Sequence, residues 1–441
     1  MEDLTHNPLP YHYSITTSLL CVKCGSCKAL CPTYIEDATE GMSARGRIAL
    51  VTKFIEGELE LSKKLDDRIF SCILCGACNK LCPLGINVTD TIYEVRNHIR
   101  GFNKKRILLG LGIKLVLKKA SNLFKALKLL ETINEIIPIF RLYPFSIIKR
   151  MDITIPTSML KDKGNIFRVS KPKGRIAIFT GCTVNFLYPN IGISLIESLN
   201  AMNYDVILPK SEVCCGAPLM GLGLKEDAAE MAEKNIKAFK KLNVEAVVGF
   251  CPTCIDFIKN GYKNLFGDAI DNAVEVSQFF KDNNEFASLL VSSQHSVAGY
   301  KNTSSQPESP KSRKTFGGAE KGSQESHRFY GTKKVIYHDP CHSVYSLNIS
   351  DEPRKILQSV GLDIIDSEKG CCGFGGTFRL LYQELSEGIL EKRIKEYQKA
   401  DMIVTSCPNC IIQLKSKIND RPIKHIVEVI NEYIKSNQKI G

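Results

Sequence analysis

The sequence predicts a multidomain protein of the α+β and α/β classes, with a helical N-terminal domain followed by two duplicated, cysteine-rich α/β domains. Three observations support this prediction. The first 100 residues hold eight cysteines in two closely spaced sets, and the C-terminal half contains one pattern of five cysteines twice. Each copy of that pattern follows apolar runs of strand length that alternate with helix-like segments.

The composition limits the classes of protein to which the chain can belong. Its 441 residues are 44% hydrophobic and 24% charged, which is typical of a folded chain of about three domains. No stretch reaches the roughly 18 apolar residues of a membrane span, and the N-terminus lacks the layout of a secretory signal. We therefore expect a cytoplasmic protein whose eighteen cysteines serve metal binding or redox chemistry instead of disulfide formation.

We expect residues 1–100 to form a helical, ferredoxin-like domain with two [4Fe-4S] clusters. Two C-x2-C-x2-C-x3-C runs, each followed by proline, consist of Cys21, Cys24, Cys27 and Cys31, and of Cys72, Cys75, Cys78 and Cys82. In bacterial ferredoxins with this spacing, the fourth cysteine of each run binds the other cluster. Cys21, Cys24, Cys27 and Cys82 would then hold one cluster, and Cys72, Cys75, Cys78 and Cys31 a second one about ten Å away.

Two alternatives remain open for these eight cysteines. Pairs of the form C-x2-C also build zinc ribbons, although a zinc site needs two separated pairs per ion and not a triplet followed by Cys-Pro. Clusters that only stabilise the fold are the second alternative. Two adjacent clusters exceed what a small domain needs for stability, so electron transfer is the favoured interpretation.

The remaining ten cysteines indicate that the C-terminal half is an internal duplication. The two sets have the same layout and consist of Cys182, Cys214, Cys215, Cys251 and Cys254, and of Cys341, Cys371, Cys372, Cys407 and Cys410. The flanking residues repeat as well, since a glycine follows each adjacent pair and each final pair has the form Cys-Pro-x-Cys. We expect the two copies to form domains over residues 171–291 and 332–441.

Each copy is predicted to contain a small parallel sheet. The predicted strands are 175–179, 205–208 and 246–250 in the first copy and 335–337, 363–365 and 402–405 in the second, with helices that include 191–202 and 227–242. Because cysteines follow these strands, the five thiols of each copy should converge at the carboxyl ends of its sheet. Gly216 and Gly373 fit a left-handed turn or a close approach of the backbone to a cluster. Redox thiols or a vicinal disulfide are less favoured alternatives for the adjacent cysteines, because the layout occurs twice.

With these motifs the sequence resembles the iron-sulfur subunits of glycolate and D-lactate dehydrogenases, which are related to the anaerobic glycerol-3-phosphate dehydrogenase small subunit and the heterodisulfide reductases. The resemblance covers almost the whole chain. It implies one or two further, noncubane [4Fe-4S] clusters, with Cys182, Cys214, Cys215, Cys251 and Cys254 binding one and Cys341, Cys371, Cys372, Cys407 and Cys410 the other.

Residues 41–48 favour the glycolate branch, because Gly-Met-Ser-Ala-Arg-Gly-Arg-Ile resembles the Pro-Arg-Gly-Arg-Ile segment of those subunits, with Ala44 in place of proline. Arg45 and Arg47 either offset the negative charge of the clusters or are solvated residues at the start of a helix. Glycolate subunits often have degenerate cysteines in the repeats, whereas both sets are complete here. Chemistry of the heterodisulfide type therefore remains an alternative.

No Gly-x-Gly-x-x-Gly segment opens a strand-to-helix unit and no P-loop is present, so we expect no FAD or NAD on this chain. Oxidation of a 2-hydroxy acid needs a hydride acceptor, which a one-electron cluster cannot be. A partner subunit that binds FAD is therefore implied. His338 and His342 flank Cys341 and either hydrogen-bond a cluster sulfur or face solvent.

Two segments are predicted to link the domains. Residues 101–170 form a basic connector, and its residues 101–150 hold eleven Lys and Arg against two Glu, which is +9 of the net charge of +12. The apolar spacing predicts amphipathic helices ended by Pro138 and Pro144, which either pack between domains or lie peripherally on an anionic membrane. No nucleic-acid reader motif accompanies the charge. Residues 292–331 hold nine serines and no Leu or Ile, which predicts a flexible linker.

Together these features predict an electron-transfer subunit. A flavoprotein partner would oxidise glycolate to glyoxylate, or D-lactate, and electrons would pass through this chain to a quinone or another carrier. The first alternative is a subunit of the heterodisulfide-reductase type that reduces a disulfide at a noncubane cluster. The second is a scaffold that only stores clusters. No catalytic residue for the oxidation of carbon can be assigned on this chain.

Overall fold

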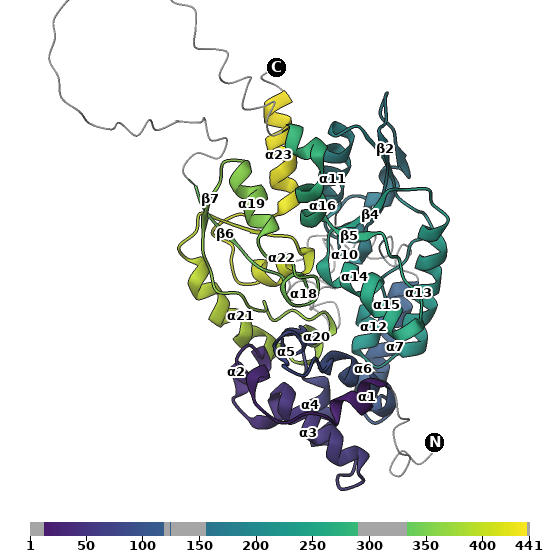
Figure 1. Cartoon of the computed structure of the whole chain (residues 1–441), viewed down its shortest axis with the longest axis vertical. Coiled ribbons are helices and arrows are strands. Elements are labelled where there is room, and N and C mark those ends of the chain that lie inside the picture. The colour runs from purple at the N-terminus through teal and green to yellow at the C-terminus, as the bar shows by residue number, and fades with distance from the viewer. Residues whose placement is uncertain (1–12, 119–123, 125–155, 290–332, 439–441) are drawn as a thin grey trace, which may run out of the picture.

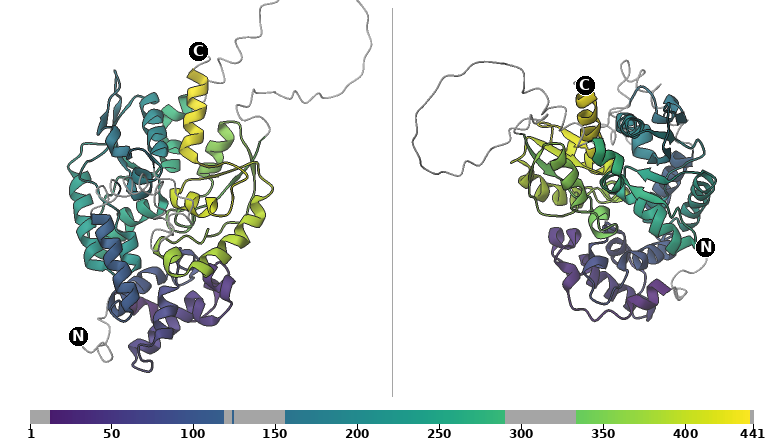
Figure 2. Two further views of the ribbon diagram at one scale, coloured as in Figure 1. Left: turned by 180° about the vertical axis from the view of Figure 1, so that it is seen from behind. Right: turned by 45° about the horizontal axis from the view of Figure 1, so that its top comes forward.

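The computed structural model describes residues 13–118, 124, 156–289 and 333–438. Within these ranges, a helical N-terminal part lies below two α/β parts that stand side by side (Figure 1). The view from behind in Figure 2 shows the same arrangement. The predicted fold class is confirmed.

The helical part consists of short helices joined by the two cysteine-bearing loops. Its elements are α1 (Tyr13–Ser18), η1 (Ser26–Lys28), α2 (Pro32–Asp37), η2 (Glu40–Met42), α3 (Ala44–Ile55), α4 (Lys63–Phe70), α5 (Ala77–Leu81) and α6 (Val88–Ile99). Ser43 fixes the start of α3, because its hydroxyl accepts a hydrogen bond from the Gly46 N–H at 2.9 Å. The buried faces of the helices meet in a core that includes Val51, Ile69 and Ile92.

Helix α7 (Lys104–Lys118) is the helix described at the start of the predicted basic connector, residues 101–170. The end of that segment, with η4 (Leu160–Lys163) and β1 (Ile166–Phe167), belongs instead to the first α/β part. Arg106 of α7 pairs with Asp66 of α4, with Nη1 3.0 Å from Oδ2, and both side chains are buried. Lys114 Nζ lies 2.6 Å from a carboxylate oxygen of Asp227 in the first α/β part. Helix α7 therefore packs between the helical part and the first α/β part. The rest of the predicted connector helices and the serine-rich segment 292–331 lie outside the described residues.

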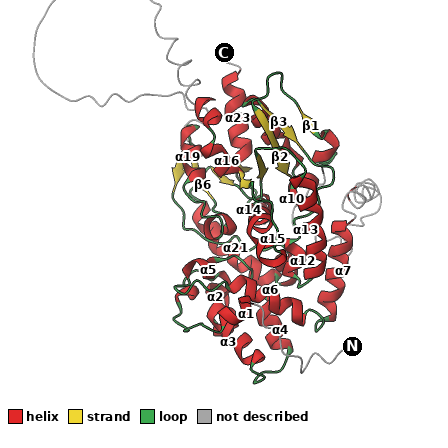
Figure 3. Cartoon of the chain, turned by 45° about the vertical axis from the view of Figure 1, so that its right-hand side comes forward, coloured by secondary structure: helices red, strands yellow, loops and turns green. Residues whose placement is uncertain are grey.

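The first α/β part contains a five-stranded sheet in the order β1-β3-β2-β4-β5, in which only β1 is antiparallel to its neighbour (Figure 3). Its elements are η4 (Leu160–Lys163), β1 (Ile166–Phe167), β2 (Gly174–Phe179), α10 (Gly181–Phe186), α11 (Pro189–Ala201), β3 (Tyr204–Ile207), α12 (Ala217–Gly221), α13 (Lys225–Lys240), β4 (Ala246–Gly249), α14 (Pro252–Asp256), the π-helical turn η5 (Phe257–Gly261), α15 (Tyr262–Phe266), β5 (Ala273–Glu275) and α16 (Val276–Asp282). Central strand β2 is buried on both faces from Ile176 to Phe179, as expected for a covered parallel sheet.

The second α/β part repeats this topology with a four-stranded parallel sheet in the order β7-β6-β8-β9. Its elements are β6 (Lys334–Tyr337), α18 (Cys341–Tyr345), α19 (Glu352–Ser359), β7 (Asp363–Ile365), α20 (Thr377–Leu381), α21 (Gln383–Tyr397), β8 (Met402–Thr405), α22 (Pro408–Lys415), β9 (Ile423–His425) and α23 (Ile426–Gln438). The six predicted strands are present with ends shifted by at most one residue. Sequence reasoning missed β1, β5 and β9, which are two or three residues long and too short to show a measurable periodicity. The equally short β7 was predicted because it has an equivalent place in the duplicated cysteine pattern.

The two α/β parts pack against each other in an approximately two-fold manner. Helix α11 of the first part contacts α23 of the second, and α16 of the first contacts α19 of the second. These are reciprocal contacts, because α11 and α19 follow the first parallel strand of each sheet and α16 and α23 follow the last. Both sheets share one apolar core, which includes Leu195 and Ile430. This approximately two-fold packing places equivalent edges of the two sheets opposite each other.

The Asp66→Ala variant should lose about 3–5 kcal/mol of unfolding free energy, because it leaves the buried Arg106 guanidinium without its charge partner. Denaturant unfolding of the purified chain measures this loss. The matched control is Asp67→Ala, which removes an exposed carboxylate from the same helix and should change stability by less than about 0.5 kcal/mol. Equal effects in the two variants would contradict the structural role of the pair.

Candidate iron-sulfur centres

The first ferredoxin-type motif lies at the surface of the helical part. A cavity of about 30 Å³ is lined by Cys21, Cys24 and Cys27 of this motif and by Cys78 and Cys82 of the second motif. Cys24 is exposed, whereas Cys21, Cys27 and Cys82 are half-buried. The structure thus brings Cys82 to the first loop, as the exchange of fourth ligands requires.

The second motif lies deeper, toward the α/β parts. Cys75 and Cys78 are buried. Burial raises the pKa of the Cys78 thiol well above its usual value, and the neighbouring Cys72, Cys31 and Cys27 raise it further. Cys31 therefore lies beside the second set of thiols, which is again the placement that an exchanged fourth ligand needs.

In the first α/β part, the five cysteines gather at the carboxyl ends of the parallel strands, as predicted. Cys182 follows β2 in α10, Cys214 and Cys215 follow β3, and Cys251 and Cys254 flank the start of α14 after β4. Hydrogen bonding to Cys214 and to Cys254 lowers the pKa of Cys215 to about 6. We call these five residues the first five-cysteine site.

The second five-cysteine site has the same construction, with Cys341 in α18, Cys371 and Cys372 after β7, and Cys407 and Cys410 after β8. Cys372 Sγ lies 3.3 Å from Cys410 Sγ. Hydrogen bonding to Cys371 and to Cys410 lowers the pKa of Cys372 below its usual value, which matches the equivalent Cys215. The two copies thus agree in the electrostatics of their thiols as well as in sequence.

The glycines after the adjacent cysteines have left-handed backbone conformations, as predicted, with φ of +93° at Gly216 and +88° at Gly373. A Cβ at Gly373 would lie 2.5 Å from the Ser386 carbonyl oxygen. The Gly373 N–H points instead toward Cys371 Sγ, at 3.4 Å. Glycine therefore lets the loop turn and aim its N–H groups at the sulfur atoms.

The two five-cysteine sites face each other across the approximate two-fold axis. Helix α14 contacts α18, and α10 contacts α22 reciprocally. Asn409 of the second part accepts a hydrogen bond from the Thr183 hydroxyl at 2.7 Å and lies 3.6 Å from Cys251 Sγ. In the equivalent contact, Thr253 lies 3.2 Å from His342 Nδ1. Between the sites lies a cavity of about 110 Å³ lined by cysteines of both, and by Cys72.

The second five-cysteine site also abuts the helical part. Cys75 packs with Cys371 in one buried cluster of side chains, against Cys341. Burial raises the pKa of Cys75 well above its usual value, and the charges of Cys371 and Cys341 raise it further. The four groups of cysteines therefore form a continuous series, which runs from the exposed Cys24 to the first five-cysteine site.

The residues present fit iron-sulfur clusters. All eighteen cysteines lie in the described residues, and none of them forms a disulfide there. The buried Cys75 and Cys410 and the half-buried Cys341 have raised pKa values, with bonding to or charge on neighbouring cysteines among the causes. Thiolates held this closely need cations between them, and iron in a cluster supplies that positive charge.

The histidines and arginines near the motifs differ in part from expectation. His338 is buried, and burial lowers its pKa to about 4, so the alternative of a solvent-facing histidine is wrong for it. His342 is half-buried, with Nδ1 3.4 Å from Cys341 Sγ. Arg47 is fully buried and donates to the carbonyls of Met42 and Arg68, so it is not a solvated residue. Its role is to tie the loop after α2 to α4.

Arg45 lies against the first cysteine loop, where its Nη1 donates to the Lys23 carbonyl at 3.0 Å. It also pairs with Glu40, with Nε 2.8 Å from Oε1. This placement brings a positive charge to the first motif.

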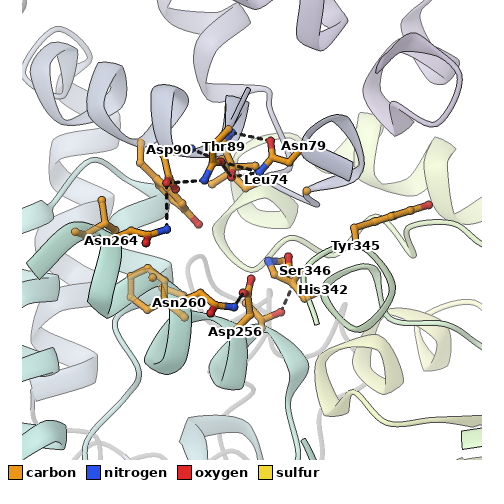
Figure 4. A pocket seen from close by; sticks show the side chains of 18 residues that line it. Leu74, Asn79, Thr89, Asp90, Asp256, Asn260, Asn264, His342, Tyr345 and Ser346 are labelled. Atoms are coloured by element: carbon orange, nitrogen blue, oxygen red, sulfur yellow. Dashed lines mark hydrogen bonds between the residues drawn. The ribbon is translucent and has the colours of Figure 1, made fainter. Parts of the chain in front are cut away.

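A polar pocket of about 200 Å³ opens beside the second motif and borders both α/β parts (Figure 4). Asp90 and Asp256 approach it from opposite sides, and His342 forms part of its wall (Figure 4). Burial raises the pKa of Asp90 to about 6, and the charge of Asp256 adds to this effect. Sequence reasoning missed both carboxylates and Asn409. Only Asn409 has a signal in the sequence, because it lies inside a Cys-Pro-x-Cys motif.

Comparison with known proteins agrees with this geometry. A family model described as a 4Fe-4S dicluster domain matches residues 17–86, and one described as a cysteine-rich domain matches residues 176–259 and 335–415. The probable glycolate oxidase iron-sulfur subunit of Bacillus subtilis is 26% identical over 94% of this chain and 92% of its own. The glycolate oxidase iron-sulfur subunit of Escherichia coli is 25% identical over 93% of both chains.

The chain thus carries a 4Fe-4S dicluster domain and two cysteine-rich domains, and it is similar over nearly its whole length to glycolate oxidase iron-sulfur subunits. The resemblance inferred from the motifs is thereby confirmed. One of the subunits of the fumarate reductase (CoM/CoB) of Methanothermobacter marburgensis also matches, at 24% identity over 96% of this chain and 74% of its own. Among the described residues of this chain, no helix is both long and apolar enough to cross a membrane.

The Gly373→Ala variant should destabilise the second α/β part by more than the roughly 1 kcal/mol of a left-handed alanine, because its Cβ also clashes with the Ser386 carbonyl. Denaturant unfolding and iron content per chain measure the effect, and we expect iron to fall as well. Gly267→Ala is the matched control, because Gly267 has φ of +80° with open space around it. Similar losses in both variants would contradict the steric argument.

Proposed function

We propose that this protein is the iron-sulfur electron-transfer subunit of an oxidoreductase complex that oxidises glycolate to glyoxylate, or D-lactate. A partner subunit that binds FAD would take the hydride from the 2-hydroxy acid, and this chain would accept its electrons one at a time and pass them to a quinone or another carrier. The series of cysteine groups from the exposed Cys24 to the buried five-cysteine sites supports this proposal.

In this proposal, Cys21, Cys24, Cys27 and Cys82 hold one [4Fe-4S] cluster and Cys72, Cys75, Cys78 and Cys31 hold another. Each five-cysteine site holds a further, noncubane [4Fe-4S] cluster. When bound, the clusters supply one-electron redox chemistry. The protein positions them, excludes water from all but the first and places hydrogen-bond donors such as the Gly373 N–H beside their sulfur ligands.

The contacts between cysteine groups support one order of electron transfer. Cys78 links the two ferredoxin-type groups, since it lines the first cavity and lies beside Cys72. Cys75 links the second group to the second five-cysteine site. Cys251 lies beside Cys407 and next to Asn409, and thereby links the two five-cysteine sites. Electrons would therefore pass through the second five-cysteine site before they reach the first.

The exposed end of this series is suited to a protein partner. Leu20 and Val22 flank Cys21, and Leu84 follows Cys82; their exposed fractions are 66%, 68% and 52%. Exposed apolar side chains grouped around an electron-transfer centre are typical of an interface core. We propose that a redox partner, such as the flavoprotein subunit, binds here.

One observation favours the alternative of disulfide reduction. The cavity between the five-cysteine sites is lined by sulfur ligands of both, so that a small disulfide could contact two clusters at once. The proposed clusters would themselves occupy the space between these cysteines. This favours the electron-transfer proposal over the binding of a large heterodisulfide.

The proposed exchange of fourth ligands can be tested by serine substitutions, because loss of one thiolate impairs only the cluster that it binds. The EPR spectrum of Cys31→Ser should lose the same signal as that of Cys75→Ser. Cys82→Ser should lose the same signal as Cys24→Ser. The opposite grouping, in which Cys31→Ser matches Cys24→Ser, would show that each motif binds its cluster alone.

The proposed function predicts that glycolate or D-lactate reduces the clusters only when the flavoprotein subunit is present, because the chain itself has no hydride acceptor. Anaerobic bleaching of the visible absorption, together with EPR, measures this reduction. Steady turnover of a thiol-disulfide substrate by the prereduced chain without a flavoprotein would contradict the proposal and support the alternative.

The same assay tests the proposed partner-binding surface around Leu20 and Val22. Leu20→Glu and Val22→Glu should weaken binding of the flavoprotein by roughly tenfold, seen as a higher KM for the partner, while the iron content stays unchanged. Leu108→Glu is the matched control, since Leu108 is 73% exposed on α7 and lines neither of the cysteine cavities.

A further inference from the structure

The second five-cysteine site has a buried polar pair that the first site lacks. His338 Nδ1 lies 2.5 Å from the hydroxyl oxygen of Tyr397, at the end of α21. In the first α/β part, Phe179 stands three residues before Cys182, just as His338 stands three before Cys341. Phe179 packs on Phe239, near the end of α13, with ring centroids 5.6 Å apart, where those of His338 and Tyr397 are 5.9 Å apart.

The other ring nitrogen of His338, Nε2, can interact with the group that the nearby cysteines hold. One ring nitrogen of His338, Cys372 Sγ and Cys410 Sγ all lie within 4.8 Å of one another. Nδ1 is occupied by Tyr397, whereas Nε2 is buried and has no hydrogen-bond partner within the described ranges. A buried nitrogen without a partner, next to two sulfur ligands, indicates an interaction with the group that those ligands hold.

The Tyr397 hydroxyl determines which nitrogen carries the proton. Burial raises the pKa of Tyr397 well above its usual value, so the hydroxyl keeps its proton. In the described contacts, His338 Nδ1 is the acceptor within reach of that hydroxyl. A neutral imidazole whose Nδ1 accepts a hydrogen bond carries its proton on Nε2. The sulfur atoms therefore face an N–H donor.

We propose that His338, oriented by Tyr397, donates its Nε2–H to a sulfur atom at the second five-cysteine site and makes that site the more easily reduced of the two. The inference rests on the clusters proposed above. A hydrogen bond to sulfur stabilises the reduced form, which carries one more negative charge, and so raises the reduction potential.

The other polar contacts of the two sites differ as well, since the Asn409 amide donates to Cys251 Sγ of the first site at 3.6 Å, whereas the equivalent Thr253 contacts His342. Among the described residues, His338 has the buried ring nitrogen that lies beside sulfur atoms and lacks a partner, and the test therefore changes this pair alone. Thr183 lies 3.9 Å from Cys182 Sγ, and the equivalent His342 lies 3.4 Å from Cys341 Sγ. The loop after each adjacent cysteine pair directs a glycine N–H at the first cysteine. The second site is also the one beside Cys75, so electrons from the helical part would come to rest there before the first site is reduced.

The test replaces the polar pair by the pair of the first site, with His338→Phe and Tyr397→Phe in the full-length chain. Potentiometric EPR measures both potentials, and Cys371→Ser and Cys214→Ser assign the signals of the second and first sites. We expect the reduced-to-oxidised ratio of the second site to fall about tenfold at fixed ambient potential, which is 59 mV for one electron. The first site should not change. Tyr397→Phe alone should give a smaller shift in the same direction.

The reciprocal variant, Phe179→His with Phe239→Tyr, should raise the potential of the first site. Unchanged potentials with full iron content would overturn the inference. Loss of iron from the second site in His338→Phe, or a strong hyperfine coupling to directly bound nitrogen in the wild type, would show that His338 is a ligand and would also overturn it. Iron confined to the ferredoxin-type motifs would contradict the proposed clusters themselves, and the inference with them.

Discussion

Mutual repulsion between closely packed thiolates is the constraint on which the rest of this structure depends. Cys75, Cys341 and Cys371 come from two different parts of the chain, yet they pack together and oppose one another's ionisation. Apolar packing alone gives no reason to gather so many ionisable groups in one place. Cations held between the sulfur atoms remove the repulsion and link the parts through shared centres.

Because the α/β part is duplicated, this local constraint also bears on how the two copies are placed relative to each other. Each parallel sheet delivers its cysteines at one edge, because every strand of the sheet ends there. The reciprocal contacts of α14 with α18 and of α10 with α22 turn these edges toward each other. Cross-contacts such as Asn409 with Thr183 then fix the distance between the two sites. The two five-cysteine sites thus face each other and together enclose one cavity.

The cysteine spacing and the strands could be predicted because both are local properties of the sequence. The C-x2-C-x2-C-x3-C runs and the apolar run of β8 depend on residues that are neighbours in the chain. The contact of Cys75 with the second five-cysteine site could not be predicted, because it joins residues almost 300 positions apart. Nor could the burial of Arg47, since a charged residue at the start of a helix is usually solvated and only its four buried acceptors explain it.

Identical ligands do not make identical centres. Both five-cysteine sites receive their thiols from the same places in the same topology, so the ligands themselves give no direction to electron flow. The direction of electron transfer must therefore depend on positions at which the two copies differ, such as Phe179 and His338. Both positions hold a buried ring that packs on a second ring, with centroids 5.6 and 5.9 Å apart, so this exchange keeps a ring pair while it alters the polarity beside the sulfur atoms. Residue differences at such positions can give the two sites different reduction potentials and so order the electron transfer between them. The cysteine ligands and the fold around both sites stay the same.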